Sequence, residues 1–128
     1  SGMNPVHLQR WCVLAAAFLP YPFSAAAKWS RRFDNHSPRV YLEATTGWQK
    51  RSHWAQLNSF EAFPAFAAAV IVNHLVLGAN AMANELALAF IASRIVYGLF
   101  YIADWALLRS IAWFAAALCS VALFVLAA

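Results

Sequence analysis

The chain has 128 residues, of which 63% are hydrophobic and only 11% are charged, and its formal net charge is +4. Soluble globular domains carry about 25% charged residues, so this composition excludes an ordinary water-soluble surface and predicts contact with membrane lipid. The sequence contains no basic runs with interleaved aromatic residues, so we do not expect nucleic acid as a partner. We expect a single domain over residues 1–128, in which Ser1 and Gly2 are a cloning remnant.

Four apolar stretches are separated by one long polar segment, residues 28–50, and by two short connections. The expected helices cover residues of about 6–30, 50–77, 82–104 and 107–127, and each is long enough to cross a bilayer. Pro20 and Pro22 predict a kink near residues 19–21, and a further short helix is expected around residues 39–45. Short connections favour antiparallel neighbours. The predicted fold is therefore all-α, an integral membrane four-helix bundle.

Basic residues are concentrated in one connecting segment. The first connection carries six of them, whereas the connection at residues 78–84 carries none; the six are Lys28, Arg31, Arg32, Arg39, Lys50 and Arg51. The positive-inside rule places basic loops in the cytoplasm. We therefore expect the first and third loops to be cytoplasmic and both termini to lie on the opposite side of the membrane.

The second expected helix begins with unusually polar residues, in the stretch RSHWAQLNSFEAFP from Arg51 to Pro64. Asn58 and Glu61 are three residues apart and share one helix face with Arg51. A charged side chain at bilayer depth costs about 2.5–3.5 kcal/mol on insertion scales, so it usually faces a bundle interior and marks a site. The alternative interpretation is an interfacial start of the helix, with Glu61 reaching water.

The third expected helix carries a similar polar face. Arg94, Tyr97 and Tyr101 follow the i, i+3, i+7 spacing of one helix face. Arg94 within a span needs a carboxylate, a cavity or an anionic ligand, and Glu61 is the expected partner. A structural pair that fixes the helix register is the alternative to a binding role. Arg109 begins the fourth helix at the same membrane edge, where an arginine is also a common interface anchor.

Together these residues predict a binding site on the cytoplasmic side. Arginines suit carboxylates, and amides and phenols suit the polar groups of a peptide, so we expect a small, anionic, peptide-like ligand. His53 is a further candidate, although a solvated interface position is the simpler interpretation. The four histidines are scattered and the sequence has no HExxH or CxxC motif, so we expect no metal site.

The two polar helices resemble those of the MAPEG family, the membrane-associated proteins of eicosanoid and glutathione metabolism. The matching stretches are RSHWAQLNSFEAFPAF on the second helix and RIVYGLFYIADWALLRS on the third helix and its exit. The resemblance extends from about Trp11 to Ala128 and is strongest to the small bacterial branch of the family. It implies a homotrimer of four-helix subunits in a bacterial inner membrane.

The resemblance also implies that glutathione binds between neighbouring subunits. Its site would be lined from one helix by Arg51, Gln56, Asn58 and Glu61, and from another by Arg94, Tyr97 and Tyr101. Arg109 would be the catalytic residue that stabilises the thiolate, because a thiol with a pKa of about 8.5 is mostly protonated at pH 7. Arg31 or Arg32 would supply a further charge.

The resemblance implies a membrane-bound glutathione transferase or peroxidase, with glutathione as co-substrate, a lipophilic electrophile or hydroperoxide as second substrate, and no metal. Two positions depart from leukotriene-synthase-like members, which have an arginine at Trp54 and a tyrosine at Ala62. These departures favour the alternative, a non-catalytic membrane scaffold or lipophile-binding protein of the same fold. A third hypothesis is a small multidrug transporter that uses Glu61.

Overall fold

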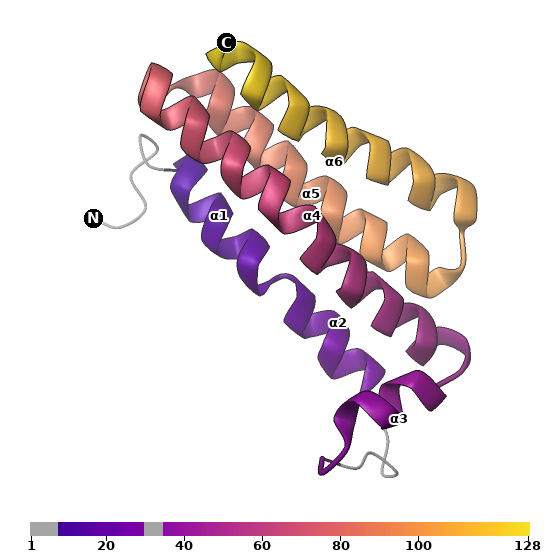
Figure 1. The fold of residues 1–128 in the computed structure, drawn as a ribbon. Helices are drawn as coiled ribbons and strands as arrows, with labels where there is room; N and C mark the ends of the chain where they lie inside the picture. Colours follow the sequence, from indigo (N-terminus) through magenta and orange to yellow (C-terminus); the bar gives the residue numbers. More distant parts are fainter. Residues whose placement is uncertain (1–7, 30–34) are drawn as a thin grey trace.

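The structure, a computed structural model, describes residues 8–29 and 35–128. All regular elements in this part of the chain are helices, as expected (Figure 1): α1 (Leu8–Phe18), α2 (Pro20–Ala27), α3 (Pro38–Ala44), α4 (Gly47–Leu77), α5 (Ala81–Ala103) and α6 (Ala106–Ala127). The described residues thus form six helices, of which α3 matches the short helix expected around residues 39–45. The first expected span is divided into α1 and α2, and the short α3 precedes α4.

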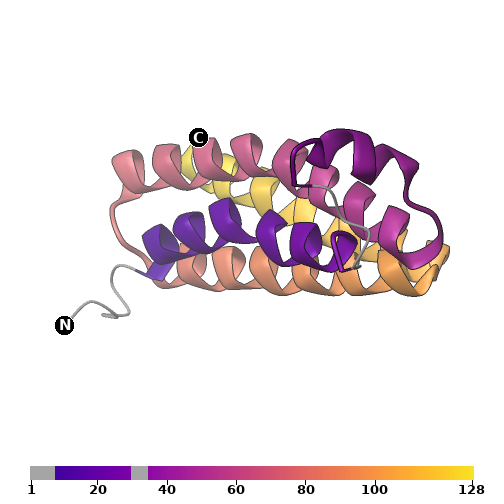
Figure 2. The ribbon, with the colours of Figure 1, turned by 90° about the horizontal axis from the view of Figure 1, so that it is seen from below.

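The division of the first span has a local cause. Leu19 separates the two helices, and Pro20 occupies the first position of α2. Proline has no N–H, and its ring clashes with the carbonyl four residues earlier, so the helical hydrogen-bond ladder is interrupted there. The break falls within residues 19–21, where the prolines predict a kink. α1 and α2 nevertheless lie end to end, with α1 against both α4 and α5 and α2 chiefly against α4 (Figure 2).

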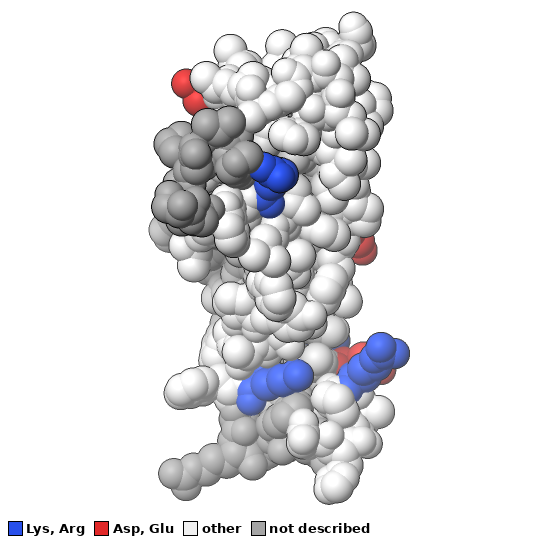
Figure 3. All heavy atoms as spheres, turned by 90° about the vertical axis from the view of Figure 1, so that its left-hand side faces the viewer, with Lys and Arg blue, Asp and Glu red and all other residues white. Residues whose placement is uncertain are grey.

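The helices α4, α5 and α6 are long and apolar enough to cross a membrane. The 22 residues of α6 extend about 33 Å, which exceeds the hydrocarbon core of about 30 Å. Leucines on their outer surfaces are strongly exposed, with Leu75 at 78%, Leu107 at 75% and Leu118 at 65%. The face in Figure 3 is largely uncharged, with most of its lysine and arginine atoms gathered toward the lower end. The protein is therefore an integral membrane protein.

Small side chains allow the helices to pack closely. Ala16, Ala69, Ala87 and Ala116 come from four different helices and are each at most 3% exposed in one core cluster. Small residues bring backbones together and increase van der Waals contact, which drives helix association in lipid. In the same cluster, the ring of Phe66 on α4 stacks on the ring of Phe90 on α5, with 3.9 Å between the ring centroids.

Buried amides join three helices at the end that holds the α4–α5 turn. Asn73 Nδ2 donates to the carbonyl of Leu123 at 2.9 Å, and Asn80 Nδ2 donates to Asn73 Oδ1 at 3.0 Å. Asn80 also caps α5 by accepting from the Ala83 N–H at 2.8 Å. Polar groups away from water must be paired within the protein, so these bonds fix the mutual positions of α4, α5 and α6.

The order of the helices collects the polar face residues at the opposite end. The C terminus, the start of α1 and the α4–α5 turn lie at one end of the molecule, and α3 and the α5–α6 turn lie at the other (Figure 1). Asp104 tightens the α5–α6 turn by adopting the left-handed backbone conformation, with φ of 64°. The first half of α4, the second half of α5 and the start of α6 therefore lie side by side.

Gly98 of α5 allows the close approach of α2, and its substitution provides a test of this packing. A methyl group at Gly98 would overlap the ring of Phe23, and both residues are buried. We expect Gly98→Ala to destabilise the protein by about 1–3 kcal/mol, because overpacking forces side chains and backbone to shift. Thermal unfolding in detergent should show the loss as a lower midpoint.

The matched control is the same substitution in a Phe23→Ala background. Truncation of Phe23 removes the ring that a methyl group would meet, so Gly98→Ala should then cost much less. An equal cost in the two backgrounds would contradict direct packing of Phe23 on Gly98.

Candidate functional site

The polar face of α4 meets α5 through Asn58. Its amide Nδ2 donates to Glu61 Oε2 at 3.4 Å, which is a long and therefore weak hydrogen bond. Glu61 is exposed, whereas Asn58 is half-buried. The i, i+3 spacing that the sequence shows thus places the amide and the carboxylate together, with the carboxylate on the open side.

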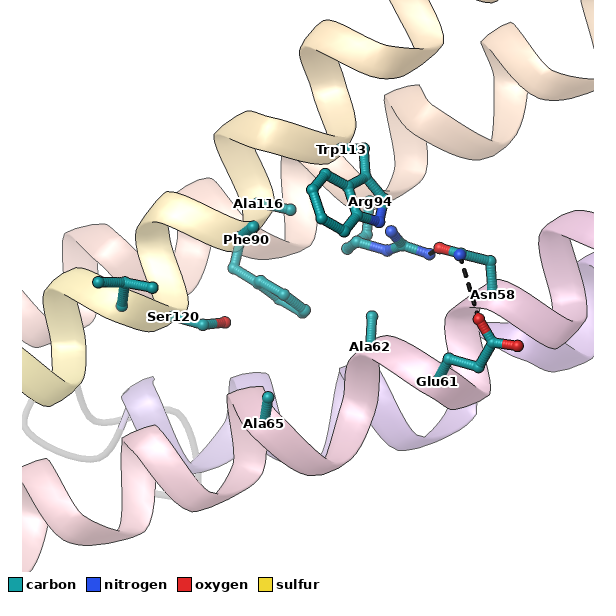
Figure 4. Close-up of a pocket in the computed structure, with 11 residues that line it drawn as sticks. Asn58, Glu61, Ala62, Ala65, Phe90, Arg94, Trp113, Ala116 and Ser120 are labelled. Carbon is teal, nitrogen blue, oxygen red and sulfur yellow. Dashed lines mark hydrogen bonds between the residues drawn. The ribbon is translucent and has the colours of Figure 1, made fainter.

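Arg94 is the most deeply buried charged group of this region, with 1% of its surface exposed. Its Nη2 donates to Asn58 Oδ1 at 2.7 Å, and its guanidinium carbon lies 4.2 Å from the centroid of the Tyr97 ring. Its Nε is buried and has no hydrogen-bond partner in the part of the chain that the structure describes. The expected pair of Arg94 and Glu61 is therefore indirect, because Asn58 lies between them (Figure 4).

Two tyrosines of α5 connect Arg94 with Arg109 of α6. The guanidinium carbon of Arg109 lies 4.6 Å from the centroid of the Tyr101 ring, and the Tyr97 and Tyr101 rings meet edge to face at 5.6 Å. A cation over an aromatic face is stabilised by about 0.5–2 kcal/mol, depending on its exposure to water. These contacts hold Arg109 at the same end of the bundle as Asn58.

Asn58 borders three hollows, which bring most of the expected residues together. One, of about 330 Å³, lies between α4, α5 and α6 and includes Glu61 and Arg94. A second, also of about 330 Å³, includes Trp54, Glu61, Tyr97 and Tyr101. The third, of about 370 Å³, is lined by Asn58, Tyr97, Tyr101, Arg109, Ser110, Trp113 and Phe114.

The hollow between α4, α5 and α6 is polar at the end with Arg94, Asn58 and Glu61, and the rest of its lining is mostly apolar, with the hydroxyl group of Ser120 as the exception (Figure 4). Arg94 and Asn58 supply the polar end, and its other walls are mostly small or aromatic, namely Ala62, Ala65, Phe90, Trp113, Ala116, Ala117, Ser120 and Val121. Its lining on α6 extends from Trp113 to Val121, which corresponds to about 12 Å of helix. This shape suits an elongated molecule with one polar end.

Two expected binding residues of α4 are placed differently from Asn58. Arg51 Nε donates to the carbonyl of Ile102 at 3.0 Å, which ties the start of α4 to the end of α5. Gln56 lies two residues from Asn58, hence about 200° around the helix, and its Oε1 is buried without a hydrogen-bond partner among the described residues.

The remaining candidates are His53, Arg31 and Arg32. The Nδ1 atom of His53 is also buried without a hydrogen-bond partner in the described ranges, 8–29 and 35–128. Arg31 and Arg32 lie outside the described residues. Within the described residues, no group of three His, Cys, Asp or Glu side chains could hold a metal ion.

Two tryptophans line the hollows, although the sequence analysis did not assign them to the site. Trp54 packs on Tyr101 with 6.2 Å between ring centroids, and Trp113 borders two of the hollows. The spacing of Ser110, Trp113 and Ala117 is i, i+3, i+7, and this pattern places them on one face of the last helix. Because the last helix is apolar and contains other aromatic residues, this spacing does not stand out in the sequence.

Comparison with known proteins identifies the family of the chain. The model of the MAPEG family matches residues 9–128, which include all but the first residue of the described helices. No curated protein and no solved structure matches the chain. Because the family match covers nearly the whole sequence, the chain belongs to the MAPEG family.

Proposed function

We propose that this protein is a membrane-bound glutathione transferase or peroxidase, with glutathione as its co-substrate. The observation that supports this most strongly is the convergence of two arginines, an amide and a carboxylate on hollows that share Asn58. Glutathione carries two carboxylates, one ammonium group and a thiol. The site combines two arginines with one carboxylate. Its charges therefore complement the two carboxylates and the one ammonium group of glutathione.

The hydrogen bonding of Arg94 supports recognition of a carboxylate. Its Nε is buried and has no partner among the described residues, and leaving a charged donor unpaired in a water-poor site is costly. A ligand carboxylate beside this guanidinium would offset part of that cost by charge attraction, and all of it only if it accepts from Nε. Glu61 is exposed and makes only a long hydrogen bond to Asn58, so it remains able to accept from the ligand ammonium group.

Arg109 is the proposed catalytic residue. Its position over the Tyr101 ring holds the guanidinium beside the hollow that Asn58 also borders. A nearby cation favours the thiolate over the thiol, and the thiolate is the nucleophile. The proton leaves to solvent, and the sulfur then forms a bond to an electrophilic carbon as the leaving group departs. With a hydroperoxide, two thiols are oxidised to a disulfide while the hydroperoxide is reduced to an alcohol and water.

The second substrate is proposed to be lipophilic. The hollow between α4, α5 and α6 is mostly apolar and has its polar end at Arg94 and Asn58. An apolar molecule from the bilayer would gain by burying its chain there while its reactive group lies near the thiol. Access from lipid fits the position of the hollow among three membrane-length helices.

The proposal includes a homotrimer in a bacterial inner membrane, in which α1 and α2 together form a fourth span. The first and third loops would be cytoplasmic, and both termini would lie on the other side. Gln56 lies on a different side of α4 from Asn58, and its buried Oε1 has no partner in the described part of the chain.

Substitution of Arg109 tests the catalytic assignment. We expect Arg109→Ala to lower glutathione-dependent turnover of a model aromatic electrophile by about 10²–10³-fold, since it removes an electrostatic stabiliser of developing charge. Arg109→Lys should retain part of the rate. The measurements are initial rates in detergent and the ultraviolet absorbance of the bound thiolate. Arg39→Ala, at an exposed position on α3, is the control and should leave both unchanged.

Two outcomes would contradict this assignment. Equal rates for Arg109→Ala and the parent protein would exclude Arg109 from the mechanism. If the parent protein shows neither turnover nor binding of glutathione by calorimetry, the proposed activity fails. The alternative, a non-catalytic scaffold or lipophile-binding protein of the same fold, would then be preferred.

A pair of substitutions on α4 tests the ligand contacts. Asn58→Leu should destabilise the protein by about 1–3 kcal/mol, because it removes the acceptor of a buried Arg94 donor. Glu61→Gln should leave the unfolding midpoint nearly unchanged, because the side chain is exposed, and should weaken glutathione binding measured by calorimetry. Unchanged affinity in Glu61→Gln would exclude this carboxylate as the partner of the ammonium group.

A further inference from the structure

We propose that a groove between α1 and α4, at the end of the molecule away from the candidate site, binds an anionic phospholipid. The groove has a volume of about 240 Å³ and is lined by Arg10, Val13, Val70, Ile71, His74 and Leu75. It does not share a lining residue with the three hollows around Asn58. The proposed lipid site is therefore independent of the proposed activity.

The order of residues along the groove matches the order of chemical groups in a lipid. Val13 lies about one turn after Arg10 on α1, and Val70 lies about one turn before His74 on α4. Because the start of α1 lies beside the end of α4, both steps lead from the end of the molecule toward its middle (Figure 1). The two polar residues thus form a mouth, and the valines form an apolar floor deeper in the membrane.

The mouth lies at the level of a membrane surface. His74 is three residues before the end of α4 at Leu77, and Arg10 is two residues after the start of α1 at Leu8. α4 is long enough to cross the bilayer, so its last turn lies near the headgroups. A phosphate bound at the mouth would then lie among the lipid headgroups, and an acyl chain along the floor would lie in the hydrocarbon core of the bilayer.

Gln9 holds His74 in an orientation that leaves a second donor. The amide Nε2 of Gln9 lies 3.2 Å from His74 Nδ1, and the Gln9 backbone N–H donates to Asn84 Oδ1 at 3.1 Å. Gln9 is 0% exposed, so its position is fixed by packing. When the Gln9 amide donates, Nδ1 is the acceptor and the neutral ring carries its proton on Nε2.

The charge of the lining selects the kind of lipid. Arg10 is permanently cationic, His74 provides an N–H donor, and the other four lining residues are apolar. A guanidinium with a neighbouring N–H suits a phosphate oxygen, and a cation near the membrane surface favours lipids with net negative charge. Ile71 and Leu75 are 54% and 78% exposed on the outer side of α4, where an acyl chain can reach them from the bilayer. The proposed ligand of this groove is therefore a phosphatidylglycerol-like lipid.

The test measures lipid retained by the purified full chain in detergent. Native mass spectrometry is performed after addition of phosphatidylglycerol or phosphatidylcholine of the same acyl composition, and thermal unfolding is followed in parallel. We expect tighter retention of phosphatidylglycerol and a larger rise of the unfolding midpoint with it. Arg10→Gln should weaken phosphatidylglycerol retention about fivefold, and the control Arg39→Gln, on α3 at the opposite end, should not.

A second variant fills the groove without changing its charge. Ile71→Trp, at a position 54% exposed and therefore tolerant of a larger side chain, should reduce retention of the acyl chain while the protein remains folded. This variant decides the proposal if Arg10→Gln does not fold. Equal retention of the two lipids by the parent protein would overturn the proposal. Undiminished phosphatidylglycerol retention in folded Arg10→Gln, or in Ile71→Trp, would also overturn it.

Discussion

The structure depends on a guanidinium group that membrane helices have removed from water. Arg94 is 1% exposed on a helix long enough to cross the bilayer, and a charge in that setting requires compensating partners. Asn58 accepts one of its hydrogen bonds, and the face of Tyr97 covers the cation. These contacts join α4 to α5. Arg94 also lines a hollow, and its Nε has no hydrogen-bond partner among the described residues. Arg94 therefore joins two helices and also lines the hollow between them.

Much of the architecture could be predicted because membrane helices follow simple physical rules. Apolar length indicated the last three helices, the lack of charge indicated lipid contact, and the prolines at positions 20 and 22 indicated the interruption at Leu19. Periodicity also placed Asn58 beside Glu61, and Tyr97 between Arg94 and Tyr101. These features depend on local spacing along one helix, which a sequence displays directly.

The remaining features depend on how helices rotate against one another, which local spacing does not determine. Opposite charges suggested a direct pair of Arg94 and Glu61, but the rotation of α4 places the shorter amide of Asn58 between them. The charge of Arg51 suggested a ligand contact, and nothing in the sequence indicated that its Nε also donates to the Ile102 carbonyl near the end of α5. In the sequence, Trp113 is indistinguishable from a lipid-facing aromatic residue. Only the packing of α6 against α4 and α5 places it at the hollow.

The interrupted first span is fastened separately on each side of Leu19. Ser52 donates to the Phe23 carbonyl at 2.7 Å and holds α2, whereas Gln9 holds α1 through Asn84. A continuous rod would have to tilt as a whole when the surrounding bilayer thins or thickens. Here the two halves of the span have separate anchors, because α2 is bonded to α4 and α1 is bonded to α5. The interruption at Leu19 therefore lies between two points of attachment.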